Sequence, residues 1–275
     1  MSTFFAVAEE LEEEGGSAVE FPPIENVVEW PAFFGEGEFF EFNKIALIGL
    51  ISFAVPVLLF VMARLSSSNS PSKIRVFVDS IVTFIEEQIA KPGIGHGYEP
   101  YVPLLTSLFL FIAIGNMFEV IPFFQMPMNA RMANPLVLAI TVWVIFVFVG
   151  FKSQGFAYFK DIVWPSHVPP ALRPLVGFIE LFSVFIVRPF SHAIRLFANM
   201  LAGHMLLITF SVLIIATIKQ VGFSASGFVL AFGFVGSLVG LIGFTAFEIG
   251  VGIIQAFVFS ILASVYIGSS LHPAH

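Results

Sequence analysis

Three apolar runs, each about as long as a bilayer crossing, limit what this chain can fold into more than any other feature. They cover residues 45–63, 102–118 and 135–150 and contain no charged side chain. At about 1.5 Å per helical residue, each run nearly matches the hydrocarbon layer, which is about 30 Å thick. Because 57% of the chain is hydrophobic and only 11% is charged, a soluble globular fold is excluded. The sequence predicts an all-α integral membrane protein with spans at about 45–63, 102–122 and 135–151.

Acidic residues are concentrated at the start of the chain, so the net charge of −7 does not describe the apolar part. Residues 1–43 hold 11 acidic residues and no Lys or Arg, whereas residues 44–275 hold all 12 basic residues. We therefore expect an acidic tail over residues 1–43 and a membrane domain over residues 44–275. Because the chain has no Cys, it forms neither disulfides nor thiolate metal sites.

A helix with one apolar face is predicted after the first span, at about residues 72–90. Such a helix lies in the plane of the membrane surface with its apolar face toward the lipid. The alternative is that this face packs on the rest of the protein. The apolar side chains recur at helical spacing and are Ile74, Phe77, Val78, Ile81, Ile85 and Ile89.

Basic residues predict the orientation of the spans. Four Lys and Arg residues lie in the loop 64–101 and three follow the third span, at positions 152, 160 and 173. The loop 125–134, between the second and third spans, contains only Arg131. Because cytoplasmic loops carry the excess of positive charge, loops 64–101 and 152–172 are expected to be cytoplasmic and the N-terminus to be outside.

The last hundred residues contain two helix-compatible segments that are too long for upright spans. The first, at about 171–218, would reach about 72 Å as one helix, with a kink expected at Pro189. The second, at about 227–270, has a similar length. Two such helices joined by one turn indicate an antiparallel hairpin, strongly tilted in the membrane, with the C-terminus in the cytoplasm. The alternative is a break near Gly250 and Gly252 into two ordinary spans, which would place the C-terminus outside.

A permanent positive charge, Arg195, lies within the first long segment. An Arg at the centre of a membrane helix costs about 2.5–3.5 kcal/mol on insertion scales, so such residues usually face a partner or a transport path. No acidic residue lies one or two turns away on the same helical face, so the counter-charge must come from another helix or another chain. A plain helix-locking ion pair is the alternative. The face comprises Arg188, Ser191, Arg195, Ala198, Asn199 and Ala202.

The residues around this arginine resemble a known family. The run SHAIRLFANMLAGH, at residues 191–204, resembles the signature of subunit a of the F-type ATP synthase. Residues 248–267, EIGVGIIQAFVFSILASVYI, resemble its second long helix, and GNMFEVIP at 115–122 resembles the end of an early span. The resemblance covers about residues 40–270.

The resemblance implies a multi-pass stator subunit in a bacterial plasma (inner) membrane. The subunit would stand beside a ring of c subunits, each with one carboxylate in the lipid bilayer, and would provide two offset proton half-channels. Peripheral-stalk b subunits and, indirectly, the soluble ATPase sector are the other implied partners, with no cofactor, no metal and no nucleic acid. Such a subunit is not an enzyme by itself. Arg195 would be the essential coupling arginine, with Gln255, Asn199 and Ser191 as polar neighbours.

Helix register assigns further residues to the half-channels. If Arg195 and Gln255 share one depth in an antiparallel hairpin, residues at equal depth have numbers that sum to about 450. His204 and Glu248 then lie near each other on the outer side of the arginine. Glu119, near the outer end of its span, is assigned to the same outer half-channel.

The inner half-channel is assigned one candidate, Glu180, which lies 15 residues before Arg195. His204 falls about 180° around the helix from Arg195, so we expect Arg195 to face the ring and His204 to face the bundle. The alternatives are that His204 only packs and that Glu119 and Glu180 only extend toward water at the span ends. Four further histidines are interpreted as linker, tail or packing residues: His167, His192, His272 and His275.

Two other classes of function are weighed against this interpretation. An autonomous ion channel or proton-coupled secondary transporter would also use a membrane-embedded Arg, a His and acids, but the chain shows no pair of broken helices in two repeated halves. An intramembrane hydrolase would need catalytic residues, and the sequence has no HExxH, no GxSxG and no Cys.

Overall fold

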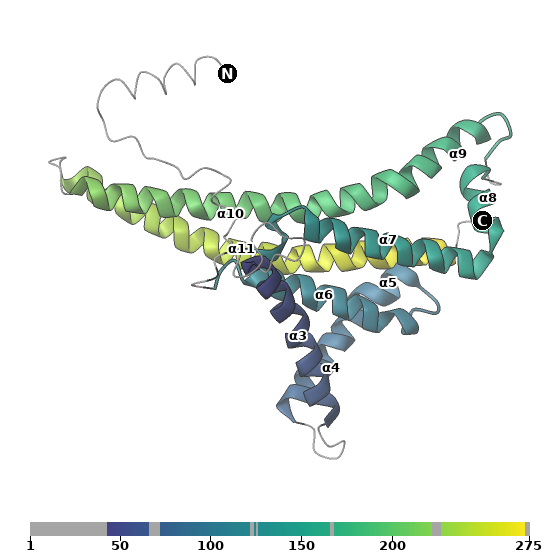
Figure 1. The fold of residues 1–275 in the computed structure, drawn as a ribbon, viewed down its shortest axis with the longest axis horizontal. Helices are drawn as coiled ribbons and strands as arrows, with labels where there is room; N and C mark the ends of the chain where they lie inside the picture. The colour runs from purple at the N-terminus through teal and green to yellow at the C-terminus, as the bar shows by residue number, and fades with distance from the viewer. Residues whose placement is uncertain are drawn as a thin grey trace. The chain divides into compact units, whose positions relative to one another are not determined.

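The computed structural model describes residues 43–65, 72–121, 124, 126–165, 168–221 and 227–272, with side chains described outside 218–231 (Figure 1). All elements in these ranges are helical, which confirms the predicted all-α class. Predictions for the acidic tail, for Pro122 and for the last three residues lie outside the described residues. Within the described ranges, five helical stretches are long and apolar enough to cross a membrane: Lys44–Leu65, Glu99–Met117, Ala133–Gln154, Arg173–Thr217 and Phe232–Leu271.

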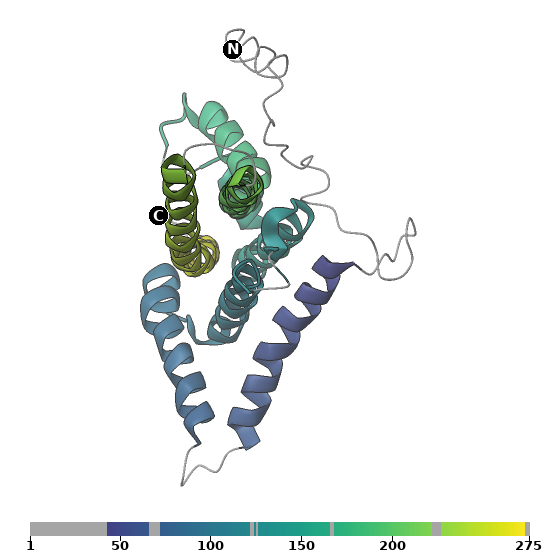
Figure 2. The ribbon, with the colours of Figure 1, turned by 90° about the vertical axis from the view of Figure 1, so that its left-hand side faces the viewer.

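The first span is helix α3, Lys44–Leu65. The carbonyl oxygen of the Asn43 side chain accepts a hydrogen bond from the Ala46 amide at 3.0 Å and so caps the helix. The buried side is a stripe that includes Ile48, Ser52 and Pro56, and it packs against α4 and α6. Figure 2 shows α3 and α4 inclined toward each other, closest at the ends joined by the linker.

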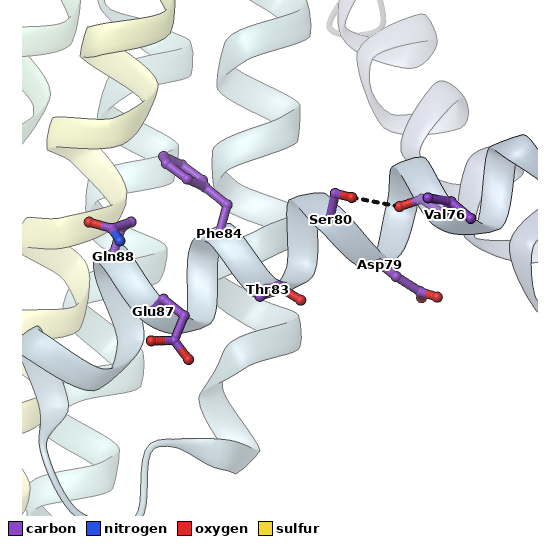
Figure 3. A pocket seen from close by; sticks show the side chains of 7 residues that line it. All are labelled: Val76, Asp79, Ser80, Thr83, Phe84, Glu87 and Gln88. Carbon is purple, nitrogen blue, oxygen red and sulfur yellow. Dashed lines mark hydrogen bonds between the residues drawn. The ribbon is translucent and has the colours of Figure 1, made fainter.

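The predicted amphipathic helix is α4, Lys73–Ile85, which continues through a π-helical turn, η1 (Glu86–Ala90), into α5, Lys91–Ile94. Part of its apolar face packs on the protein, because Val78, Ile85 and Ile89 are buried, while Phe77 is exposed. The polar side carries a shallow pocket to which no predicted site residue contributes. Figure 3 shows the residues that line it, namely Val76, Asp79, Ser80, Thr83, Phe84, Glu87 and Gln88.

The second span begins with a 3-10 turn, η2 (Glu99–Tyr101), and continues as α6, Val102–Met117. The helix ends five residues before the predicted boundary at 122. Short turns replace it there, since the amide of Glu119 bonds the Asn116 carbonyl and the amide of Val120 bonds the Met117 carbonyl, each at 3.2 Å. Glu119 therefore lies in the turn beyond the helix rather than within it.

The loop that connects the second span to the third is partly buried in the protein interior. It contains the short helix η3, Met128–Ala130, and residues Met126, Met128 and Asn129 are buried. The third span is α7, Ala133–Gln154. Sequence analysis assigned the following region to a loop, but the structure contains an amphipathic helix there, α8, Phe156–Val163.

The predicted first long segment is helical from α9, Arg173–Phe182, through a π-helical turn, η4 (Ser183–Val187), to α10, Arg188–Val221. The π turn directly precedes Pro189, whose missing amide cannot donate to the carbonyl four residues earlier. The same arrangement occurs at η1, which precedes Pro92. In both places a neighbouring helix donates to a carbonyl of the π turn: Trp143 Nε1 to Val184 at 3.1 Å, and Ser264 Oγ to Ile89 at 2.8 Å.

The second long segment is one continuous helix, α11, Gly227–Leu271. The alternative of a break near Gly250 and Gly252 is therefore wrong. The chain divides into two compact units, and the smaller one, in its described part, lies within Met205–Phe247. Inside that unit α10 and α11 pack through the rings of Phe210 and Phe244, whose centroids are 5.1 Å apart.

The larger unit comprises Pro31–His204 and Glu248–His275 and contains every predicted site residue. Its core joins α4, α6, α7, the first part of α10 and the last part of α11. The α11 helix approaches α5 closely, because a Cβ on Gly268 would overlap the backbone of Gly93. The largest side chains fully buried in this core are Ile85, Ile89, Leu105, Ile112, Phe146, Leu196, Met200, Phe259 and Ile267.

Candidate functional site

The first half of α10 has two chemically different faces. Arg195, Ala198, Asn199 and Ala202 are exposed on one side, and Arg188 and Ser191 continue this stripe half-buried. On the opposite side Leu196, Met200 and His204 are buried. A charge, an amide and two small residues therefore share the face that this chain leaves uncovered. Such small residues permit the close approach of another helix.

A hydrogen bond joins the two long helices beside the arginine. The Nδ2 atom of Asn199 donates to Oε1 of Gln255 at 2.7 Å. Gln255 is 3% exposed, and its Nε2 has no hydrogen-bond partner among the described residues. The side-chain oxygen of Gln255 is therefore bonded to Asn199, while its Nε2 group remains available to donate hydrogen bonds.

The contacts between α10 and α11 in this unit follow the register expected from the sequence. Hydrogen-bonded, stacked or touching pairs have residue numbers that sum to between 451 and 454. These pairs are Asn199 with Gln255, His192 with Phe259, Gly203 with Glu248, and Arg188 with Tyr266. The two helices are thus antiparallel neighbours through the whole region around Arg195.

Glu119, His204 and Glu248 form a buried acidic cluster. The Nδ1 atom of His204 lies 3.8 Å from Oε1 of Glu119. All three residues are 4–5% exposed. Glu248 lies against Gly203, where an added Cβ would overlap its carboxylate. One oxygen of each carboxylate, Oε1 of Glu119 and Oε2 of Glu248, has no hydrogen-bond partner among the described residues.

A chain of amides supports this cluster from the side of α6. Asn129 Nδ2 donates to Asn116 Oδ1 at 2.7 Å, and Asn116 Nδ2 donates to the Gly252 carbonyl at 3.3 Å. Gly252 lies one turn from Glu248 on α11, and Asn116 lies three residues before Glu119. The amide chain therefore ties the end of α6, just before the turn that holds Glu119, to the part of α11 that carries Glu248.

The remaining predicted residues lie apart from this cluster. Ser191 Oγ donates to the Arg188 carbonyl at 3.4 Å on the arginine face. Glu180 is half-buried on α9, and its carboxylate forms no hydrogen bond or ion pair with any other described residue. Along one helix, the 15 residues between Glu180 and Arg195 correspond to about 22 Å.

Three residues that the sequence analysis did not assign to the site contribute to its geometry. Gly203 makes room for Glu248, and it could have been found by the register, which pairs 203 with a residue near 248. The ring of His192 lies against that of Phe259, one turn before Arg195, with an angle of 41° between the ring planes. Asn129 has no local signal, because it reaches Asn116 only through the fold of a loop. In the described part of the chain, no group of three or more His, Asp and Glu residues is arranged to hold a metal ion.

Known proteins resemble this chain over most of its length. A sequence model of the family described as ATP synthase A chain matches residues 45–268. The ATP synthase subunit a of Frankia alni is 41% identical over 208 residues, which is 74% of this chain and 69% of that protein. The subunit a of Rhodococcus erythropolis is 36% identical, covering 85% of this chain and 84% of the relative. That of Pseudarthrobacter chlorophenolicus is 34% identical, covering 91% and 93%.

Proposed function

Because the chain belongs to the ATP synthase A chain family, we propose that it is the membrane-embedded stator subunit that couples proton flow to rotation of a c-subunit ring. Family membership confirms the resemblance found in the sequence. This membership favours the ATP synthase subunit over the two alternatives, the autonomous transporter and the intramembrane hydrolase. The finer assignments, to Arg195 and to two half-channels, are the substance of the proposal.

The observation that carries the proposal is the position of Arg195 on an exposed face of α10. A guanidinium on a membrane helix is costly unless it meets an opposite charge or a polar path. No ion pair with Arg195 is formed within the described residues, while Ala198 and Ala202 leave space beside it for another helix. A ring of c subunits, each with one membrane carboxylate, supplies both the missing charge and the missing helix.

The chemistry follows from the charge of the arginine. A guanidinium within about 4–6 Å lowers the pKa of a carboxylate by about 1–3 units, so a ring carboxylate that reaches Arg195 releases its proton. A guanidinium group is effectively always charged, so an arginine cannot relay that proton. Its fixed charge also repels protons from a direct route between the two sides of the membrane.

The buried acidic cluster is proposed to belong to the outer half-channel. Its carboxylate oxygens and the His204 ring lie behind α10, on the side away from Arg195, so protons would pass through the bundle before they reach the ring. Histidine suits this step because its ordinary pKa lies near neutrality. Glu180, on the opposite side of the arginine along the helix, is proposed to line the inner half-channel. Asn199 and Gln255 would orient the region between them.

The proposed orientation places the N-terminus outside and the C-terminus in the cytoplasm, in a bacterial plasma membrane. It rests on the basic residues of loops 64–101 and 152–172. The b subunits of the peripheral stalk and, indirectly, the soluble ATPase sector complete the proposed set of partners. The subunit would catalyse no reaction by itself.

The test replaces the arginine in the assembled enzyme. We expect Arg195→Ala to abolish ATP-driven proton pumping and ATP synthesis in membrane vesicles, and to raise passive proton leakage once the soluble sector is removed. The c ring should still co-purify with the variant in mild detergent. Arg75→Ala is the matched control, because Arg75 forms a surface ion pair with Asp79 outside the proposed proton path, and this variant should pump at the wild-type rate. Normal ATP synthesis by the Arg195 variant would refute the assignment.

A further inference from the structure

His192 is a buried titratable residue for which the proposed mechanism has no use. It is 2% exposed, and its ring centroid lies 3.8 Å from that of Phe259 and 5.7 Å from that of Tyr266. Its Nε2 atom is buried and has no hydrogen-bond partner among the described residues. The stack explains why a flat ring is present at this position. It does not explain why the ring is an imidazole, since a phenyl ring would stack without burying a polar atom.

The position of His192 relative to Arg195 suggests a reason. The two residues lie three apart on α10, one helical turn from each other. Long side chains on a helix lean toward the N-terminus, over the turn that precedes their own Cα. We therefore expect the guanidinium of Arg195 to lean toward the turn that holds His192.

Other acceptors near Arg195 are already used or open to solvent. Asn199 is engaged with Gln255 at 2.7 Å, on the turn away from the lean of the arginine. Ser191 is only half-buried and donates to the Arg188 carbonyl. An acceptor that stays buried without a donor costs stability, so the Nε2 atom of His192 gains most from a guanidinium that folds back onto it.

We propose that His192 is a positioning residue that accepts a hydrogen bond from the Arg195 guanidinium through Nε2 in the interval between two ring carboxylates. This inference rests on the function proposed above, in which Arg195 is periodically released by a departing carboxylate. In that interval the guanidinium would otherwise be mobile. The bond to His192 keeps the positive charge fixed beside α11, where it blocks direct passage of protons.

The test separates the nitrogen of His192 from its ring. His192→Phe keeps the stack on Phe259 but removes the acceptor, whereas His192→Gln loses the ring and keeps an amide acceptor at a similar reach. We expect the Phe variant to leak protons at least about tenfold faster in stripped membranes, because a hydrogen bond to a charged group shifts an equilibrium by about tenfold or more. The Gln variant should stay close to wild type.

Controls address packing and assembly. Met200→Leu, a change of shape at a fully buried position on the same helix, should leave the leak unchanged. Co-purification of the c ring is measured first for every variant. If the Phe variant does not assemble, His192→Met provides a second side chain without a strong acceptor.

A second arm asks whether His192 acts through Arg195. The leak of Arg195→Ala should not increase further when His192→Phe is added, since the bond has lost its donor. A wild-type leak in the Phe variant would overturn the inference, as would equal impairment of the Phe and Gln variants or an additive leak in the double variant. Any of these results, with Arg195→Ala still inactive in pumping, leaves the proposed function intact. Normal pumping by Arg195→Ala would instead remove the function itself.

Discussion

Two clusters of carboxylates in this protein solve the same electrostatic problem in opposite ways. In the surface cluster, formed by Glu86, Glu87, Lys91 and Tyr98, each charge has a partner. Tyr98 donates to Glu86 at 2.9 Å, and Lys91 bonds Glu87 and lies 3.4 Å from Glu86. In the buried acidic cluster two carboxylates and one histidine are packed together, and one oxygen of each carboxylate lacks a hydrogen-bond partner among the described residues.

The difference shows what each cluster is built to do. The surface cluster is complete in the folded chain, so it stabilises the turn between η1 and α6 and needs nothing else. A buried acceptor without a donor costs about 1–3 kcal/mol, and the buried acidic cluster contains two of them. A site of this kind is retained when its groups exchange a proton or water during function, which is the role proposed for the outer half-channel.

The largest expected effect comes from exchanging the residues of the buried acidic cluster. His204→Glu and Glu248→His should each lower ATP-driven proton pumping at least about tenfold, because like groups shift each other's pKa away from the working range. His204→Glu should be the worse of the two, since it brings a third carboxylate next to those of Glu119 and Glu248. The double exchange restores one imidazole and should recover part of the rate.

A double-mutant cycle on proton-pumping rates measures this coupling. Additive losses, with no recovery in the double variant, would show that His204 and Glu248 do not work as a pair. The buried acidic cluster would then be a structural feature, and the contrast with the surface cluster would disappear.

An intermediate effect is expected from Gly203→Ala. The added methyl group would overlap the Glu248 carboxylate, so the carboxylate must move away from its position in the cluster. Overpacking of this kind typically costs about 1–3 kcal/mol, and pumping should fall several-fold. Gly236→Ala on α11 is the matched control, because a Cβ there meets nothing within 4 Å. Equal pumping rates for the two variants would mean that the position of Glu248 is not critical.

The smallest effect is expected in the surface cluster. The hydrogen bond from Tyr98 lowers the pKa of Glu86 most, and the hydrogen bond from Lys91 lowers it further. A lowered pKa stabilises the fold above the unfolded value of about 4.5, and this stabilisation is lost as the pH falls through the folded pKa. Tyr98→Phe should therefore lower the Tm of the detergent-purified membrane sector by about 1–2 °C at pH 7 and have no effect at acid pH.

Tyr101→Phe is the control for this measurement, since the Tyr101 hydroxyl has no hydrogen bond with any described residue. Proton pumping should be unchanged in both tyrosine variants. A pumping defect in Tyr98→Phe would show that the surface cluster is not purely structural and would weaken its contrast with the buried acidic cluster.

The sequence by itself determined the spans, the two long helices, the outward position of Arg195 and the pairing register of the hairpin. These features are local or periodic. Run length reports the bilayer, and helical spacing reports which residues share a face. If Arg195 and Gln255 share one depth, the other positions that pass each other in two antiparallel helices follow. For the same reason the sequence placed His204 on the side of α10 opposite to Arg195.

Only the tertiary structure decided how close the side chains come. Three contacts join residues that are separated in the chain. They are the hydrogen bond of Asn129 with Asn116, the contact of Gly203 with Glu248 and the ring contact of His192 with Phe259. The early end of α6 was likewise not predicted from the sequence, nor were the π turns before Pro92 and Pro189, where side chains of neighbouring helices donate to the Ile89 and Val184 carbonyls. Periodicity gives the direction of a side chain, but its distance from a partner depends on how helices pack, and packing is a property of the whole bundle.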